Sequence, residues 1–285
     1  MPKLPDWFKK NIKKGDAGLK LAKKLTGQIP NCICLEARCP NRAECFNKKQ
    51  LTFLVLGKTC TRNCSFCSVN KGKPSPPDKK EAETILETIA KLGLKFVVIT
   101  SPTRDDLVDG GAGHFAFIIK EIRKHHPKIK IEVLIPDFQG NQDALNKVVQ
   151  ANPDVINHNL ETVPQLYETI RPQAVFNRSL KLLSTIKSLN PGILSKTGLM
   201  VGFGETEQDL VHTFHQIAAT QVNILTIGQY LKPSRVNIEV KKYYNPTEFN
   251  KLESLAKEQG IEFVFAGPLI RSSFLAEDIF RKYRS

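Results

Sequence analysis

The chain has 285 residues, of which 41% are hydrophobic, enough to bury the core of one large α/β domain with short extensions. No run approaches the ~18 apolar residues of a membrane helix. Residues 1–16 lack the apolar segment of a signal peptide, so we expect neither a membrane association nor secretion. The net charge of +14 is expected to reflect a solvated, lysine-rich surface, with attraction to an acidic protein partner as the alternative. No recognised nucleic-acid motif accompanies the charge, so we do not expect nucleic acid.

From residue 51 onward, short apolar runs alternate with helical patterns, which indicates a parallel sheet with crossover helices. The apolar runs span 51–57, 96–101, 129–136, 155–160, 195–202, 224–230 and 262–266. The helical patterns span 79–92, 113–125, 142–151, 177–189, 207–220 and 246–259. Six such units are fewer than the eight of a closed barrel. We therefore predict an N-terminal extension (1–50), an α/β domain (51–259) and a C-terminal extension (260–285).

All seven cysteines lie between Cys32 and Cys67, and six of them form two triplets, Cys34-x4-Cys39-x5-Cys45 and Cys60-x3-Cys64-x2-Cys67. Thiols this dense, without a secretory signal, indicate metal ligands in a reducing cytoplasm rather than disulfides. A triplet that holds a four-iron cluster leaves one iron open to another ligand. A zinc module completed by His114 or another histidine is the alternative, although zinc favours paired spacing. Cys32 fits neither spacing, and we interpret it as a spectator thiol.

The second triplet, in CTRNCSFC (60–67), resembles the signature of the radical S-adenosylmethionine (SAM) enzymes. The first, in CLEARCPNRAEC (34–45), resembles the motif of the lipoyl synthase family. That resemblance continues through TSPTRDDLVDGGAGHF (100–115), VINHNLETVPQLYETIRP (155–172), GLMVGFGET (198–206), QYLKPS (229–234) and GPLIRSSF (267–274). It implies an open, partial (β/α)6 radical-SAM barrel whose two extensions hold an auxiliary iron–sulfur cluster.

The resemblance also implies an activity, a sulfurtransferase step of lipoate biosynthesis and protein lipoylation. Two sulfur atoms would be inserted at carbons 6 and 8 of an octanoyl chain carried on a protein lysine. The cofactors would be SAM and two [4Fe-4S] clusters, a catalytic one on Cys60, Cys64 and Cys67 and a sulfur-donating one on Cys34, Cys39 and Cys45. The fourth ligand of the auxiliary cluster would be Ser273 rather than Ser272. A serine oxygen is a poor ligand for a soft cluster, which suits a cluster that must come apart.

Further positions resemble the SAM contacts of radical-SAM enzymes. Gly198-x-Met200-x-Gly202-x-x-Glu205 resembles the motif that holds the adenine, with an ordinary strand-to-helix turn as the alternative. Asn157 and Glu161 resemble a ribose-contacting pair, and a cluster of helix-capping residues is the alternative for them. Arg178 is a candidate for the SAM carboxylate or for a surface ion pair. His114 and His158 are expected to be hydrogen-bonding residues rather than ligands.

The implied substrates are octanoylated lipoyl carrier domains, namely acyltransferase subunits of 2-oxoacid dehydrogenases and the glycine-cleavage carrier protein. Such domains are typically acidic, so the basic charge of this chain would speed their encounter. The implied electron donor is a protein such as ferredoxin or flavodoxin. The chain departs from the family pattern at Leu35, Pro102, Thr103, Asn237 and Phe274, and none of these departures removes a cluster ligand.

Two other functions fit parts of the pattern. A tRNA methylthiotransferase would also use two clusters and suit a basic chain, but that family places a large domain before the SAM triplet, where this chain has 59 residues. An iron–sulfur electron carrier, or a zinc module fused to a barrel, would not be an enzyme. A carrier normally closes its clusters with four thiolates, which neither triplet provides.

Overall fold

The computed structural model describes residues 4–9, 31–274 and 276–284. Most of the lysine-rich N-terminal stretch of the sequence lies outside these residues. The chain divides into two compact units. The β1–β5 unit comprises Ile12–Arg62, Val69–Val155 and Ser273–Ser285, and the β6–β9 unit comprises Met1–Asn11, Asn63–Ser68 and Ile156–Ser272. No helix in the described ranges has both the length and the apolar character to cross a membrane.

Seven strands form one sheet, in the order β1-β4-β5-β6-β7-β8-β9. Their bounds are β1 Thr52–Leu54, β4 Phe96–Thr100, β5 Lys130–Leu134, β6 Val155–Asn157, β7 Leu194–Val201, β8 Ile224–Gln229 and β9 Phe263–Gly267. The registers are parallel, with Phe53 opposite Ile99 in the first unit and Leu199 opposite Ile227 in the second. The expected alternation of strands and helices is confirmed, because a helix precedes each new strand of the sheet.

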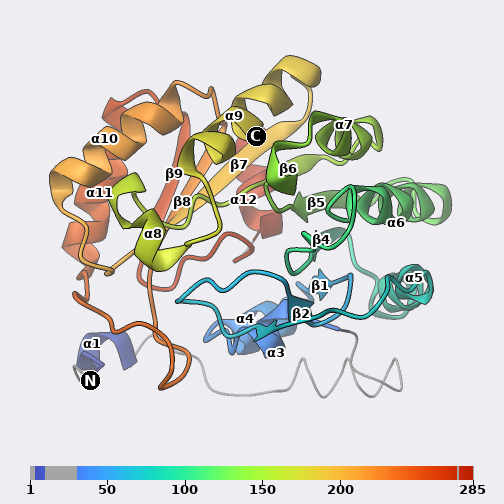
Figure 1. Ribbon diagram of the computed structural model, residues 1–285, viewed down its shortest axis with the longest axis horizontal. Helices are drawn as coiled ribbons and strands as arrows, with labels where there is room; N and C mark the ends of the chain where they lie inside the picture. The colour runs from blue at the N-terminus through green and yellow to red at the C-terminus, as the bar shows by residue number, and fades with distance from the viewer. Residues whose placement is uncertain (1–3, 10–30, 275, 285) are drawn as a thin grey trace. The chain divides into compact units, whose positions relative to one another are not determined.

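In the β1–β5 unit, α5 (Lys80–Leu92), α6 (Ala112–His125) and α7 (Gln142–Gln150) follow β1, β4 and β5 in turn (Figure 1). Helix α5 starts where the Asp78 carboxylate accepts the Lys80 N–H at 2.9 Å, and it ends at Gly93, whose φ of 62° suits glycine. Its buried face presents Ile85 and Ile89 to the core. The unit also contains α3 (Ile33–Glu36), α4 (Arg42–Asn47), η1 (Phe138–Gly140) and α12 (Ala276–Arg284).

In the β6–β9 unit, the crossover helices are α9 (Phe176–Leu189), α10 (Glu207–Ala218) and α11 (Pro246–Glu258). Thr206 with Asp209, and Asn245 with Glu248, form capping boxes that fix the starts of α10 and α11. The remaining elements of the unit are α1 (Asp6–Lys9), η2 (Pro164–Leu166) and α8 (Tyr167–Ile170).

The sequence pattern did not predict the small parallel ladder of β2 (Thr59–Cys60) and β3 (Asn70–Lys71). Each strand has only two residues, too short for any periodic pattern. The ladder pairs Cys60 with Lys71 and so brackets the loop that carries the second cysteine triplet. The predicted boundaries at residues 50 and 259 remain predictions.

Asp154 stabilises the junction of β5 and the segment that follows α7. Its carboxylate accepts hydrogen bonds from Arg123 at 2.5 Å, Lys130 at 2.8 Å and the Ile131 N–H at 2.9 Å. Partial burial alone would raise the pKa of Asp154, but these donors outweigh burial and lower it.

The substitution Asp154→Asn should lower the free energy of unfolding by about 1–3 kcal/mol at pH 7. A lowered carboxyl pKa stabilises the fold above the pKa of the unfolded state, and this contribution is lost as pH falls through the folded pKa. The difference between parent and variant should therefore shrink as pH falls from about 5 to about 2, as measured by urea denaturation. Asp143→Asn, at an exposed position of α7, is the control, and an equal effect there would contradict this account.

Candidate functional site

A small cavity in the β1–β5 unit gathers part of the first cysteine triplet. Cys34 and Cys45 line it together with Ser273. Cys34 lies on α3 and Cys45 on α4, and the turn between these helices is closed by a hydrogen bond from the Cys39 N–H to the Cys34 carbonyl at 3.0 Å. The cavity thus joins thiols of residues 34–45 to a serine more than two hundred positions further along the chain.

Helix α12 determines where Ser273 lies, because it begins three residues later. Asp278 accepts a hydrogen bond from Lys48, just after α4, at 3.2 Å. The ring of Phe280 packs against Phe96 of β4 with centroids 5.6 Å apart. These contacts hold the C-terminal segment against the elements that carry the first triplet.

The two consecutive serines of the RSSF segment have different surroundings. Ser272 belongs to the β6–β9 unit, where its hydroxyl oxygen accepts a hydrogen bond from the Asn159 amide at 3.1 Å. Ser273 belongs to the β1–β5 unit and lines the cavity with Cys34 and Cys45. Ser273, and not Ser272, therefore shares a cavity with two cysteines of the first triplet, and its role as a cluster ligand stays a prediction.

Cys32 lies beside the first triplet, at the start of α3, and its side chain contacts that of Cys34. This contact, followed by burial, raises the pKa of the Cys34 thiol well above its usual range. Metal ligation requires the thiolate, so loading of the site must displace this proton. In the described residues no group of three or more His, Cys, Asp or Glu side chains is arranged to hold one metal ion. In an iron–sulfur cluster each thiolate binds a different iron, so the three cysteine side chains do not have to meet at one point.

The second triplet begins in β2 and ends before β3, so it lies between the two strands of the ladder. Cys60 ends β2, and its carbonyl accepts the Gly72 N–H at 3.0 Å. Its sulfur accepts the Arg62 N–H at 3.4 Å. Cys64 and Cys67 lie in the β6–β9 unit, and the Cys67 N–H donates to the Cys64 carbonyl at 3.3 Å. The eight-residue spacing keeps the three thiols within one loop.

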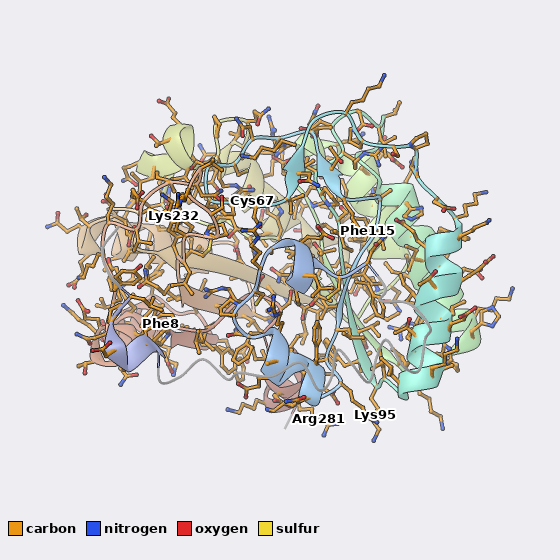
Figure 2. All side chains as sticks on the ribbon, turned by 90° about the horizontal axis from the view of Figure 1, so that it is seen from below. Phe8, Cys67, Lys95, Phe115, Lys232 and Arg281 are labelled. Carbon is orange, nitrogen blue, oxygen red and sulfur yellow. The ribbon has the colours of Figure 1, made fainter. Side chains whose placement is uncertain are left out.

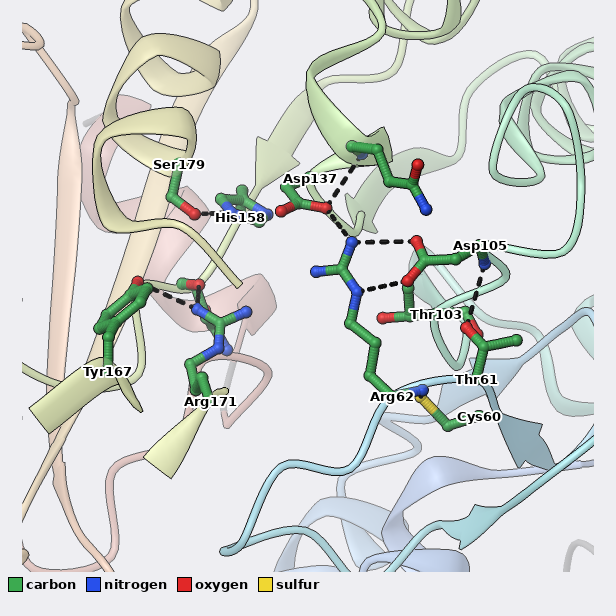
Figure 3. A network of polar contacts seen from close by, with 12 residues as sticks. Cys60, Thr61, Arg62, Thr103, Asp105, Asp137, His158, Tyr167, Arg171 and Ser179 are labelled. Atoms are coloured by element: carbon green, nitrogen blue, oxygen red, sulfur yellow. Dashed lines mark hydrogen bonds and ion pairs between the residues drawn. The ribbon is translucent and has the colours of Figure 1, made fainter. Parts of the chain in front are cut away.

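A buried ion network anchors Arg62, inside the second triplet, to loops after β4 and β5 (Figure 3). Its guanidinium donates to Asp105 at 2.6 and 2.9 Å and to Asp137 at 2.6 Å. Burial alone would lower the pKa of Arg62, but the two carboxylates outweigh burial and raise it. The sequence analysis did not single out Arg62. Two features of the sequence could have indicated its role. Arg62 is a cation between two cysteines, and a pair of acidic residues, Asp105 and Asp106, follows the second predicted strand.

The candidate ribose contacts lie at and after β6. Asn157 is fully buried at the end of the strand. Glu161 has a φ of 69°, a backbone conformation that costs a non-glycine residue roughly 1–3 kcal/mol. Its N–H and carbonyl are held by Gly198 and Met200 of β7, at 2.9 and 2.8 Å.

A polar network surrounds the Glu161 side chain. The Asn159 amide donates to the Glu161 carboxylate at 3.0 Å. Burial raises the pKa of Glu161 although Arg171, Asn159 and Arg271 oppose it. Arg171 itself donates to the carbonyls of Asn159 and Leu160 at 2.9 and 3.0 Å. Asn159 is therefore a further candidate for this site, and the sequence analysis did not single it out.

The segment after β7 forms a tight turn. The Glu205 carboxylate accepts the N–H groups of Gly202, Phe203 and Gly204, at 2.6, 2.9 and 3.1 Å. A Cβ at Gly202, whose φ is 109°, would lie 2.3 Å from the Gln229 amide nitrogen, so only glycine fits there. Glu205 thus shapes the turn through the backbone.

The remaining residues that the sequence analysis named, Met200, Arg178 and the two histidines, lie in different elements. Met200 is half-buried against a cluster of Ile170, Phe203, Tyr230 and Val240. Arg178 lies in the first turn of α9. Both histidines make hydrogen bonds, His158 with Ser179 at 2.9 Å (Figure 3) and His114 with Glu81 at 2.8 Å.

Comparisons with known proteins identify the class. A family model described as the radical SAM superfamily matches residues 54–217. The crystal structure of Streptococcus suis SuiB bound to S-adenosylmethionine aligns with a TM-score of 0.60 at 12% identity, over 80% of this chain and 54% of that one. Methylornithine synthase (PylB) aligns with a TM-score of 0.55 at 12% identity, over 90% and 80%. The fold and this domain define a radical SAM enzyme, and the partial barrel expected from the sequence is confirmed.

Curated relatives narrow the class to one family. A lipoyl synthase of Alkaliphilus metalliredigens is 47% identical over 98% of this chain and 96% of its own length. A lipoyl synthase of Caldanaerobacter subterraneus subsp. tengcongensis is 46% identical over 96% of this chain and 95% of its own. The chain belongs to the lipoyl synthase family and is a radical-SAM sulfur-inserting enzyme. It uses a [4Fe-4S] cluster and SAM.

The substitution Arg62→Met should lower the free energy of unfolding by about 3–5 kcal/mol, because it leaves the buried Asp137 carboxylate without its cation. The double variant Arg62→Met/Asp137→Asn should recover part of this loss, since no unpaired charge then remains at Asp137. Urea denaturation of the three proteins measures the difference. Equal losses in the single and double variants would contradict the ion-pair account.

Proposed function

We propose that this chain forms protein-bound lipoyl groups by inserting two sulfur atoms, at carbons 6 and 8, into an octanoyl chain carried on a lysine. Its membership of the lipoyl synthase family supports this activity. The observation that carries the proposal is the cavity in which Ser273 lies with Cys34 and Cys45, because a sulfur-donating cluster needs its own ligands apart from the SAM triplet. Relatives matched over nearly the whole chain favour this activity over tRNA methylthiolation.

Cys60, Cys64 and Cys67 are proposed to hold the catalytic cluster. The cluster and SAM, when bound, supply a 5′-deoxyadenosyl radical that abstracts hydrogen from unactivated carbon. Three thiolates leave one coordination position for SAM, so the donor set fits this role. The role of this chain is to hold the loop and to exclude water. Arg62 contributes by fixing the first half of the loop to Asp105 and Asp137.

Cys34, Cys39, Cys45 and Ser273 are proposed to hold the auxiliary cluster. Three soft thiolates fit an iron–sulfur cluster, and the serine oxygen is the harder, more easily released ligand. Ser273 sits just before α12, whose contacts with Lys48 and Phe96 keep it at the cavity. Both ligand types are therefore provided by this chain.

Asn157, Glu161, Arg178, Met200, Gly202 and Glu205 are proposed SAM-site residues. Asn157 and Glu161 would bind the ribose hydroxyls, with the Glu161 carboxylate oriented by Asn159. Gly202 and Glu205 would act through the turn that they build, since the Glu205 carboxylate is already engaged by three backbone N–H groups. Met200 would offer an apolar contact and Arg178 a cation for the carboxylate.

The family acts on lipoyl carrier proteins. We propose acyltransferase subunits of 2-oxoacid dehydrogenases and the glycine-cleavage carrier protein as substrates, in a reducing cytoplasm. The electron donor is proposed to be an acidic protein such as ferredoxin or flavodoxin. The net charge of +14 supports both partners by electrostatic attraction.

The substitution Cys39→Ala should abolish lipoyl formation and leave SAM cleavage, because only the auxiliary cluster loses a ligand. Iron after anaerobic reconstitution should fall from about eight to about four per chain, as expected for the loss of one cubane. Formation of 5′-deoxyadenosine and of the lipoylated product are measured separately. Loss of SAM cleavage in a variant that retains the catalytic cluster would contradict the division between the two triplets.

Ser273→Ala and Ser272→Ala form a matched pair. Ser273→Ala should reduce lipoyl formation at least about tenfold, equivalent to ~1.4 kcal/mol, because the auxiliary cluster loses a ligand. Ser272→Ala removes only the hydrogen bond from Asn159 and should retain most activity. Product analysis by mass spectrometry and Mössbauer spectra of the auxiliary cluster check the pair. The reverse order of effects would assign the ligand to Ser272.

A further inference from the structure

The loop that follows β8 holds the second half of the cysteine loop. The Asn237 side chain donates hydrogen bonds to the carbonyls of Ser65 and Cys67, at 3.1 and 3.0 Å. Ser234 donates to the Asn237 amide oxygen at 2.6 Å, which orients the amide so that its NH2 group faces both carbonyls. Asn237 is buried, so these bonds are shielded from water.

Further contacts make this attachment rigid. The Ile238 N–H donates to the same Ser65 carbonyl at 3.2 Å. The Tyr230 hydroxyl donates to the Ile238 carbonyl at 2.8 Å. Phe66 packs beside Phe203, with ring centroids 6.2 Å apart, in the same apolar cluster as Tyr230. Residues 231–243, the clamp loop, are therefore fixed to the backbone of a cluster cysteine. Figure 2 labels Cys67 and, from the clamp loop, Lys232 among the side chains of the structure.

The other face of the clamp loop is exposed and basic. Val236, next to Asn237, is 93% exposed, and Arg235 beside it is also exposed. The loop carries four cations and one carboxylate, Glu239. The Lys232 side chain is only 9% exposed and Lys242 pairs with Glu248, so the exposed face presents Arg235 and Lys241. Glu239 already pairs with Lys232. An exposed apolar side chain among cations is the composition expected of a docking surface for an acidic protein.

We infer that the clamp loop is the docking surface for the acidic one-electron carrier that reduces the catalytic cluster, an inference that rests on the proposed function. One electron passes from the carrier to the cluster, so the carrier is oxidised and no bond forms or breaks in that step. Electron transfer weakens steeply with distance. Arg235 and Val236 lie two residues and one residue, respectively, from Asn237, whose side chain donates to the Cys67 carbonyl.

An octanoylated carrier domain is also acidic, but its position must satisfy a different requirement. Its octanoyl chain has to reach SAM at the open iron. The clamp loop contacts the peptide backbone of Cys67, so an electron donor docked there would lie close to a proposed cluster ligand. The electron carrier is therefore the partner that this surface fits.

The test compares a protein donor with a small-molecule donor. In the reconstituted enzyme, Arg235→Glu/Val236→Asp should slow reduction by flavodoxin hydroquinone at least about tenfold at low ionic strength, because charge reversal removes electrostatic steering. Added salt should narrow the difference. Reduction by dithionite should be unchanged. The readouts are bleaching of the cluster absorbance and formation of 5′-deoxyadenosine from SAM.

Lys181→Glu, at an exposed position of α9 in the same unit, is the charge-reversal control and should leave reduction by flavodoxin unchanged. Iron content and circular dichroism verify that each variant folds and loads, and Arg235→Gln repeats the test with a smaller expected change. Three outcomes would overturn the inference. These are unchanged reduction by flavodoxin, equal slowing with dithionite, or a raised KM for the octanoylated carrier domain with normal reduction.

The readout separates this inference from the proposed function. A parent enzyme that cleaves SAM with flavodoxin but forms no lipoyl product would contradict the proposed function, and the comparison of donors would still be decisive for the clamp loop. Suppose instead that the parent enzyme makes lipoyl groups normally and that flavodoxin reduces the double variant as fast as the parent. This result would contradict the docking surface and leave the proposed function intact.

Discussion

The buried guanidinium of Arg62 is the interaction on which the arrangement of the cysteine loop depends. A loop of alternating cysteines and polar residues has little apolar surface with which to fold itself. Arg62 compensates by binding two carboxylates from the ends of neighbouring strands, one of which, Asp137, is fully buried. Removing either charge leaves the other uncompensated in a medium of low polarity. The loop is therefore fixed by the same strand ends that, in parallel α/β proteins, present reactive groups.

The second half of that loop is fixed differently. Asn237 and Ile238 bind backbone carbonyls, and Phe66 enters an apolar cluster. Neutral hydrogen bonds to carbonyls add no charge next to the cysteines, so this half can be held firmly without a charged group at the cluster thiols. The Asn237 amide does not titrate between pH 5 and 8, so this attachment does not depend on pH in that range.

The two serines before α12 illustrate how one short segment can serve two units. Ser272 is engaged by Asn159, which also orients the Glu161 carboxylate. Its neighbour Ser273 faces thiols of the first triplet. The residues proposed for the SAM site and for the auxiliary cluster therefore meet at two consecutive positions of the chain. The strained backbone of Glu161 lies in the same network, where hydrogen bonds to β7 sustain it.

The sequence by itself determined the chemistry and the fold class. Three thiols within eight residues are close in any conformation of the chain, and the alternation of apolar and helical periods is set by local geometry. The tertiary structure alone decided the partners of Arg62, 43 and 75 positions away, and the hydrogen bond from Asn237 to Cys67 across 170 positions. It also decided that Ser273 and Ser272 have different surroundings. The Glu205 carboxylate accepts backbone N–H groups of its own turn, which the sequence pattern did not predict. Such contacts depend on strand register and on helix packing, which join residues that no local pattern relates.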